Sequence, residues 1–237
     1  MSTTLPSCTE CNLRRIALCG TIAERAPVEY SRLSRSFERV KARRLICRAG
    51  TIPTSLSFIY EGWAIAFRIL SNGRRQIIDI RLPGDVIGLR AVPALPLTLS
   101  VQAVTDVTLC VFERQEIIDL GMRDPETANE LYRRSMNYIH SLEDRLVEIS
   151  RHSAASRIAS LILRLRDKLT QRGRVQDNAF EFPLTQSQIA DACGLTTAHV
   201  NRVLSELRFG GVMSLASGRL AIQNEEYLLV LARSAEG

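Results

Sequence analysis

LTQSQIADACGLTTAHVNRVLSELRF, residues Leu184–Phe209, contains two short apolar stripes of helical period, one on each side of Gly194. Gln186–Ala192 is predicted to form the first helix, and Gly194 allows the positive φ that a sharp turn requires. Thr196 can cap the second helix, because its hydroxyl can accept a hydrogen bond from a backbone N–H two or three residues later. Two short helices joined by a glycine turn predict a helix-turn-helix.

The polar face of the second predicted helix has side chains suited to reading DNA. Arg202 can donate to a guanine or to a phosphate, and Asn201 can hydrogen-bond to a base edge in the major groove. A helical hairpin inside a protein core is the alternative, but a core hairpin would hardly place Arg202 and Arg208 together on its polar side. The residues predicted to face DNA are Thr197, Ala198, His199, Asn201 and Arg202, with Ser205 on the same side.

Length and charge limit the classes of protein to which the chain can belong. At 237 residues it exceeds one ordinary domain, and a hydrophobic content of 46% is enough for two cores. A formal net charge of +6 favours a polyanionic partner. The sequence has neither a long apolar run nor an apolar N-terminal signal core, which predicts a cytoplasmic protein without a membrane span. Its six cysteines are then expected to stay reduced or to bind metal.

The sequence pattern of Arg44–Phe112 is typical of an all-β region. Short β-branched and aromatic runs are separated by turn signals, among them Asn72-Gly73, which is typical of a β-hairpin, and Pro83-Gly84-Asp85. Many short strands at regular spacing indicate an antiparallel sandwich or barrel. After the helix-turn-helix, two further short strands around Ser217-Gly218 predict a β-wing.

Four other segments are predicted to be helical from their apolar spacing: Ala23–Arg43, Glu113–Arg123, Glu126–Ser150 and Ser156–Leu169. The third of these is long, lacks Gly and Pro, and has a narrow apolar stripe with the three-four-three spacing of a two-stranded coiled coil. A helix packed on its own sheet is the alternative, but the narrow stripe favours a dimer. The predicted dimer seam is Ile139, Leu142, Leu146 and Ile149.

A small β-barrel, a long dimer helix and a C-terminal winged helix-turn-helix, in that order, resemble the Crp/Fnr superfamily of bacterial transcription regulators. The resemblance covers nearly the whole chain and is carried by GRRQIIDIRLPGDVIGL (Gly73–Leu89), RIASLILRL (Arg157–Leu165) and GLTTAHVNRVL (Gly194–Leu204). It implies an α+β fold and a homodimer that binds a palindromic promoter site and contacts RNA polymerase. The implied parts are a cysteine-rich segment (1–22), a cyclic-nucleotide-binding-like jelly-roll barrel (23–123), a dimerisation helix (124–153) and a winged helix-turn-helix (154–237).

The recognition segment departs from the best-known pattern of this family, Glu-x-x-Ser-Arg. The matching positions here are Ala198, Asn201 and Arg202, so the guanine-reading arginine is kept and the cytosine-reading carboxylate is not. The resemblance therefore implies a related but altered operator.

Cyclic AMP, which the founding members of the family bind, is not expected as a ligand. In the family a Gly-Glu pair holds the ribose and an Arg-Ser/Thr pair holds the cyclic phosphate. After Gly84-Asp85 this chain has no matching Glu, and Leu99-Ser100 stands in place of the phosphate clamp. A buried phosphate without its cation would be costly.

The N-terminal cysteines, Cys8-x2-Cys11-x7-Cys19, suggest a metal site, because thiolates suit zinc or iron–sulfur clusters and four of them close either site. They resemble the oxygen-sensing Fnr branch, in which a fourth cysteine comes from the barrel strand just before the helices, where this chain has Cys110. The resemblance implies a [4Fe–4S] cluster on Cys8, Cys11, Cys19 and Cys110, with Leu18 as an apolar shield. Two alternatives stay open: Cys110 is a buried strand thiol and the other cysteines bind zinc or nothing, or Cys47 is the fourth ligand.

The dimer helix also departs from the Fnr branch, which has a self-repelling acidic residue where this chain has Leu142. An apolar residue there favours association, so the dimer is expected to persist without a cluster. The resulting hypothesis is an oxygen- or redox-responsive transcription regulator. The alternative is a regulator of the same type without a cluster, which is controlled by another barrel ligand or constitutively active. No Ser-His-Asp set, phosphate loop or carboxylate pair suggests an enzyme.

Overall fold

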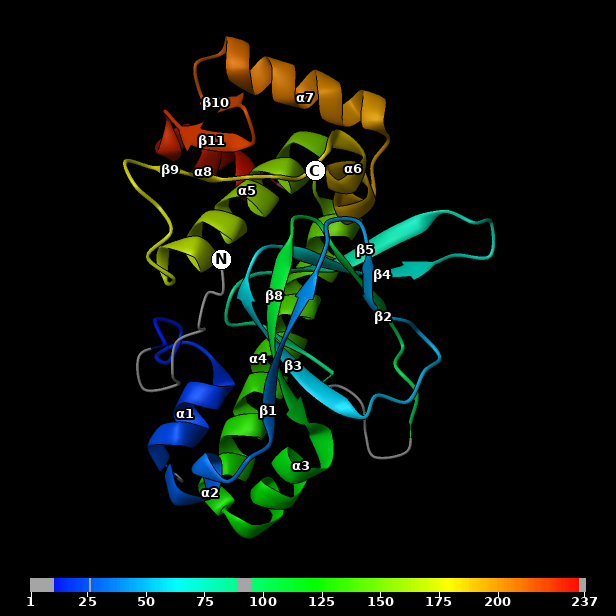
Figure 1. The fold of residues 1–237 in the computed structure, drawn as a ribbon. Helices are drawn as coiled ribbons and strands as arrows, with labels where there is room; N and C mark the ends of the chain where they lie inside the picture. Colours follow the sequence, from blue (N-terminus) through cyan, green and yellow to red (C-terminus); the bar gives the residue numbers. More distant parts are fainter. Residues whose placement is uncertain (1–10, 26, 89–94, 235–237) are drawn as a thin grey trace. The chain divides into compact units, whose positions relative to one another are not determined.

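The computed structural model describes residues 11–25, 27–88 and 95–234 (Figure 1). They fall into two compact units. The first contains the described residues up to Arg68 together with Asp79–Tyr138, and the second contains Ile69–Ile78 together with the described residues from Ile139 onward.

The first unit is a sandwich of antiparallel strands, as the sequence predicted. One sheet has the order β1-β8-β3-β6 and the other the order β2-β7-β4-β5, so the strands form two sheets and not one closed barrel. The strands of the two sheets are β1 (Arg35–Val40), β2 (Leu45–Cys47), β3 (Ser55–Glu61), β4 (Ala64–Ile69), β5 (Arg75–Arg81), β6 (Val86–Ile87), β7 (Ser100–Ala103) and β8 (Val107–Glu113). The first residues of β5, up to Ile78, are grouped with the second unit. The helices of this unit are α1 (Leu18–Arg25), α2 (Pro27–Ser31), α3 (Arg114–Arg123) and the first half of α4 (Pro125–Arg151).

Strand β8 is central to the first sheet and positions Cys110. Cys110 pairs with Phe37 of β1 on one side and with Phe58 of β3 on the other. Helices α1 to α3 pack on this sheet, where the rings of Phe58 and Phe112 meet edge to face at a centroid distance of 5.5 Å. This core consists of Leu18, Ile22, Tyr30, Leu56, Phe58, Cys110, Phe112, Ile117 and Leu120.

The predicted helix Ala23–Arg43 is wrong. The chain forms two short helices there, α1 and α2, and then β1, in which Phe37 and Val40 lie. Every residue of β1 pairs with β8, and this long-range pairing outweighs the helical spacing of the local sequence, because intrinsic propensity is a weak preference. Leu18 is fully buried in the core that α1 shares with β3 and β8.

The second unit confirms the predicted helix-turn-helix and wing. The second half of α4 is followed by α5 (Ala154–Thr170), α6 (Gln186–Cys193) and α7 (Thr197–Phe209). Strands β10 (Met213–Ala216) and β11 (Arg219–Ile222) form the wing. Two elements were not predicted: β9 (Ala179–Glu181), which pairs with β11, and the last helix, α8 (Glu225–Arg233).

Arg145 connects α4 to the helix-turn-helix. Its side chain is buried and donates to the carbonyl oxygen of Ala192 at 2.9 Å and to that of Ile78. Beside it, Arg75 binds the carboxylate of Asp191 at 2.8 Å. Because the last carbonyls of a helix carry partial negative charge, a guanidinium at the end of α6 is favourably placed.

Candidate nucleic-acid interface and metal centre

Helix α7, the second helix of the helix-turn-helix and its predicted recognition helix, has well-defined ends, which fix the orientation of its polar face. Thr196 caps its N-terminus, and its hydroxyl accepts from the backbone N–H of His199 at 3.3 Å. Gly194 ends α6 with φ 66°, a conformation that glycine adopts without strain. Thr185 caps the N-terminus of α6 with a capping box, in which the Thr185 N–H donates to Gln188 Oε1 at 2.9 Å.

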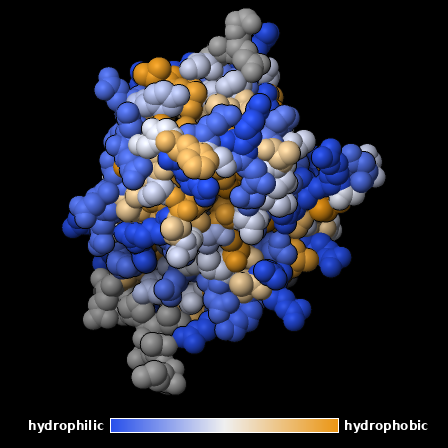
Figure 2. Space-filling view, turned by 90° about the horizontal axis from the view of Figure 1, so that it is seen from above, coloured by the Kyte–Doolittle hydropathy of each residue, from blue (hydrophilic) through white to orange (hydrophobic). Residues whose placement is uncertain are grey.

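The predicted DNA-facing residues of α7 all lie on its exposed side, whereas the opposite side packs into the domain. Figure 2, seen from above the view of Figure 1, shows a mostly hydrophilic surface with apolar groups between the polar ones. The exposed residues are Thr197, Ala198, His199, Asn201 and Arg202, and the buried ones are Val200, Val203, Leu204 and Leu207.

The side chain of Arg202 is accessible on the exposed face of α7. It pairs with Glu206 of the next turn at 3.9 Å, and both side chains are about two-thirds exposed. An ion pair of this kind contributes roughly 0–1 kcal/mol, so the guanidinium can exchange Glu206 for a base or a phosphate at little cost. The ring of His199, in contrast, is hydrogen-bonded to Thr196, with 3.1 Å between His199 Nδ1 and Thr196 Oγ1.

Cys193, between the two helices, is a core thiol. Its sulfur is buried and lies 3.8 Å from the carbonyl oxygen of Arg157. Burial raises the pKa of Cys193 to about 12. Reactivity belongs to the thiolate, so this geometry does not favour a redox role near the recognition helix.

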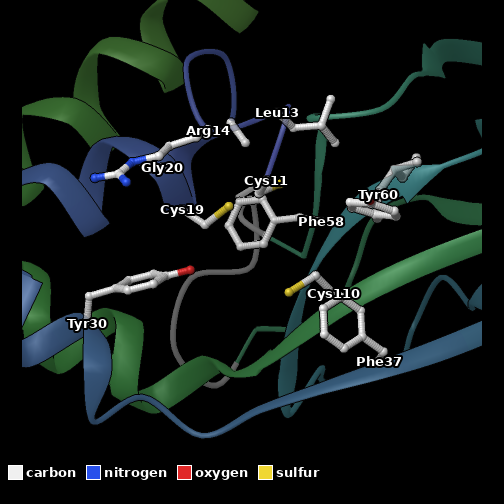
Figure 3. Close-up of a pocket in the computed structure, with 12 residues that line it drawn as sticks. Cys11, Leu13, Arg14, Cys19, Gly20, Tyr30, Phe37, Phe58, Tyr60 and Cys110 are labelled. Carbon is white, nitrogen blue, oxygen red and sulfur yellow. The ribbon is translucent and has the colours of Figure 1, made fainter. Parts of the chain in front are cut away.

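Three of the four cysteines predicted as cluster ligands line one cavity in the first unit. Cys11 precedes α1, Cys19 lies in its first turn, and Cys110 lies on β8. In Figure 3 the sulfur atoms of Cys19 and Cys110 and the hydroxyl of Tyr30 point toward the same space. The rest of the lining is largely apolar and includes Leu13, Ala17, Phe37, Phe58 and Ile59.

The fourth predicted ligand, Cys8, lies outside the described residues. Within residues 11–25, 27–88 and 95–234, no three His, Cys, Asp or Glu side chains are close enough together to hold a metal ion. The donors nevertheless have the right chemistry for an iron–sulfur cluster, because three soft thiols line one largely apolar cavity. Sequence analysis did not single out Arg14, Gly20 or Tyr30, which also line this cavity.

Cys47, the alternative fourth ligand, lies elsewhere. It belongs to β2 in the other sheet and lines a second cavity together with Arg81, Gly88, Leu97 and Leu99. Burial raises the pKa of the Cys47 thiol. The thiols of Cys47 and Cys110 therefore face different cavities.

In the described lining of this second cavity, the positive charge belongs to Arg81. Burial disfavours the charged form of Arg81, but the carboxylates of Asp79 and Asp85 outweigh it and raise the pKa of Arg81. Asp79 lies 3.3 Å from the guanidinium, which also stands over the ring of Tyr138. The cation that reaches the described part of the cavity is thus already neutralised, and the aliphatic side chain of Leu99 cannot hold a phosphate.

The predicted dimer seam forms an exposed apolar stripe on α4. Ile139, Leu146 and Ile149 are exposed, with Leu146 at 69%, and Leu142 is half-buried. Monomeric proteins seldom expose a large apolar patch, so this side of α4 is a candidate surface for the predicted dimer seam.

Two domain families match the chain in the predicted order. Residues 37–124 match the cyclic nucleotide-binding domain, and residues 156–231 match the Crp-like helix-turn-helix domain. The chain belongs to the Crp/Fnr family. Since the second domain is a DNA-binding module, the chain is a DNA-binding transcription regulator, and α7 is the recognition helix that this family uses.

Individual relatives agree with this family over most of the chain. A probable transcriptional activator of Rhizobium leguminosarum bv. viciae is 28% identical over 90% of this chain and 87% of its own length. The transcriptional activator protein FnrL of Cereibacter sphaeroides is 28% identical over 93% of this chain and 89% of its own length. The solved structure of FixK2 from Bradyrhizobium japonicum shares the fold, with a TM-score of 0.78 and 23% identity over 86% of this chain and 100% of that one. The relatives are named as transcription regulators and not as enzymes. Among the described residues, no helix is long and apolar enough to cross a membrane.

Proposed function

We propose that this Crp/Fnr regulator is a homodimer whose binding to promoter DNA responds to oxygen or redox state through a [4Fe–4S] cluster on Cys8, Cys11, Cys19 and Cys110. The observation that carries the proposal is the shared cavity of Cys11, Cys19 and Cys110. These residues come from two segments about ninety positions apart in the sequence. A shared ligand would explain why the fold brings both segments to one cavity. When bound, such a cluster supplies a group that oxygen converts or destroys.

The chain's own residues supply the remaining parts of this function. Thiolates of the cysteine segment and of β8 would hold the group, and the apolar rings of Phe37 and Phe58 would limit the access of water to it. The seam of α4 would join two protomers, which places two recognition helices over a roughly palindromic site. Contact with RNA polymerase is proposed from the family and from the activator names of the relatives.

The test is the iron and acid-labile sulfide content of protein purified without oxygen, together with its absorption spectrum. About four of each per chain, with a brown chromophore that bleaches in air, is the expected result. Cys110→Ala should abolish the chromophore, and Cys47→Ala, which removes a strand thiol from the other cavity, should keep it. Zinc alone, or no metal in the wild type, would refute the cluster.

The second candidate is a regulator of the same type without a cluster, either controlled by a ligand in the cavity of Arg81 and Cys47 or constitutively active. Two observations favour it: the described residues hold no preformed metal site, and this cavity lies inside the matched nucleotide-binding domain. A metal-free wild type that binds operator DNA at full affinity would support it.

A further inference from the structure

The cysteine segment is a compact turn that fits closely against α1. Ala17 donates its N–H to the carbonyl oxygen of Leu13 at 2.8 Å, which closes the turn between Cys11 and Cys19. A methyl group on Gly20 would lie 1.8 Å from the carbonyl oxygen of Arg14, so the turn and the helix approach as closely as glycine permits. A displacement of this turn therefore moves Cys19 and the start of α1 with it.

Helix α4 is attached to this turn through Arg134. The Arg134 side chain donates to the carbonyl oxygen of Ile16 at 3.0 Å. At the start of α1, the N–H of Gly20 donates to the carbonyl oxygen of Ala17 and not to that of Ile16. The Arg134 guanidinium therefore supplies a donor to the Ile16 carbonyl, just before the first turn of α1. Ile16 lies three positions before Cys19, within the turn that carries the thiols.

Glu130 holds the Arg134 guanidinium in place. This carboxylate is 6% exposed and accepts from Arg134 Nε at 2.7 Å, while its oxygens also accept from Arg133 at 2.7 Å. Burial disfavours the charged carboxylate, but the hydrogen bonds from Arg133 and Arg134 outweigh it and lower the pKa of Glu130. The pair therefore stays charged at neutral pH, and Arg134 points at Ile16 and not into solvent.

We propose that Arg134, held by Glu130, is a positioning residue through which the cysteine segment and the dimer helix act on each other. Its regulatory meaning rests on the proposed cluster, because a change at the thiols is what would displace the turn. Arg134 lies about one and a half helical turns before Ile139, the first seam residue, on the same unbroken helix. A change in the turn thus reaches α4 by a direct hydrogen bond.

The chain provides a matched control for this residue. Arg133 binds the same Glu130 but its side chain is 60% exposed, and the hydrogen bond to Ile16 comes from Arg134 and not from Arg133. Arg134→Gln removes the charged donor to Ile16, and Arg133→Gln removes an equal charge from the same carboxylate. Arg134→Lys keeps the charge but not the fork that reaches Glu130 and Ile16 together, and it serves if Arg134→Gln folds poorly.

The first measurement is amide hydrogen exchange of the metal-free protein. In Arg134→Gln and Arg134→Lys, residues 13–21 should exchange about tenfold faster than in the wild type, which corresponds to one charge-assisted hydrogen bond. Arg133→Gln should match the wild type in this segment. Unchanged exchange in the Arg134 variants, or an equal increase in all three, would overturn the proposal.

The second measurement is the ratio of DNA affinities with and without iron reconstitution. The wild type and Arg133→Gln should show the same ratio, and the ratio should fall toward one in Arg134→Gln although it still binds iron. A full ratio in Arg134→Gln would show that the contact is merely structural and would overturn its regulatory role. A wild type that binds no iron would refute the cluster, whereas the exchange experiment would still decide whether Arg134 holds the turn.

Discussion

Leu142→Asp tests whether the apolar stripe of α4 is a dimer seam. In the proposed dimer each Leu142 side chain leaves water against its partner, and burial of a leucine is worth roughly 1.5–3 kcal/mol. Symmetry doubles the effect, which gives roughly 3–6 kcal/mol. Because Leu142 is already half-buried within its own chain, the lower end applies, and 3 kcal/mol corresponds to a dimer dissociation constant about 100-fold higher.

The assay is sedimentation of metal-free protein over a range of concentrations, with Val147→Asp as the control. Val147 is also an exposed aliphatic residue of α4, but it lies about 100° around the helix from Leu146 and off the stripe. The same substitution there should change the dissociation constant less than about threefold, as surface substitutions usually do. The wild type should remain dimeric without metal. Equal effects of the two variants, or a wild type that is monomeric without metal, would refute the reasoning.

Substitution or modification of four other residues has the following expected outcomes. Arg202→Ala should cost about 1–3 kcal/mol of discrimination at one base pair in each half-site; equal losses on specific and random DNA in a titration would mean that Arg202 contacts only phosphate. Gly20→Ala should displace the cysteine segment, because its methyl group meets the carbonyl of Arg14, and iron bound per chain should fall in elemental analysis; normal loading would contradict this. Thr185→Ala removes the capping box of α6 and should lower the free energy of unfolding in urea by about 1 kcal/mol, and no change would count against the cap. Cys193, with its pKa raised to about 12, should resist iodoacetamide at pH 8 in the folded protein. Because burial raises the pKa of Cys193, the neutral thiol stabilises the fold below pH 9, the pKa of an unburied thiol, and this contribution is lost as the pH rises toward 12. Between these pH values the free energy of unfolding should therefore decline less steeply in Cys193→Ala than in the wild type. Parallel declines in the two proteins would contradict the assignment.

The parts of the fold that the sequence predicted are those with strong local signals. Thr196 and Gly194 define the ends of the two helices of the helix-turn-helix by capping and by positive φ, and both signals are visible in single residues. The long stripe of α4 is equally local, because it depends only on spacing along one helix. These elements were predicted close to their observed bounds.

The wrong and missing elements depend on distant partners. Strand β1 exists because β8 pairs with it, and β9 exists because β11 does, so no window of local sequence contains the information. The cysteine site shows both cases. The spacing of Cys11 and Cys19 is visible in the sequence, whereas the link from Ile16 to Arg134 joins residues 118 positions apart.

Arg145 has a consequence for the geometry of the operator. It lies on the same helical turn as the seam residues Leu142 and Leu146, and its guanidinium holds the last turn of α6 through Ala192. The proposed dimer seam and the support of the helix-turn-helix therefore occupy neighbouring positions on one turn of α4. In a dimer, a small rotation of α4 about its own axis would swing both recognition helices in opposite directions. The separation of two half-sites along the DNA would then be set by the packing of a few leucine and isoleucine side chains, and substitutions in the seam would alter which operator spacing the protein prefers without changing any residue that touches a base.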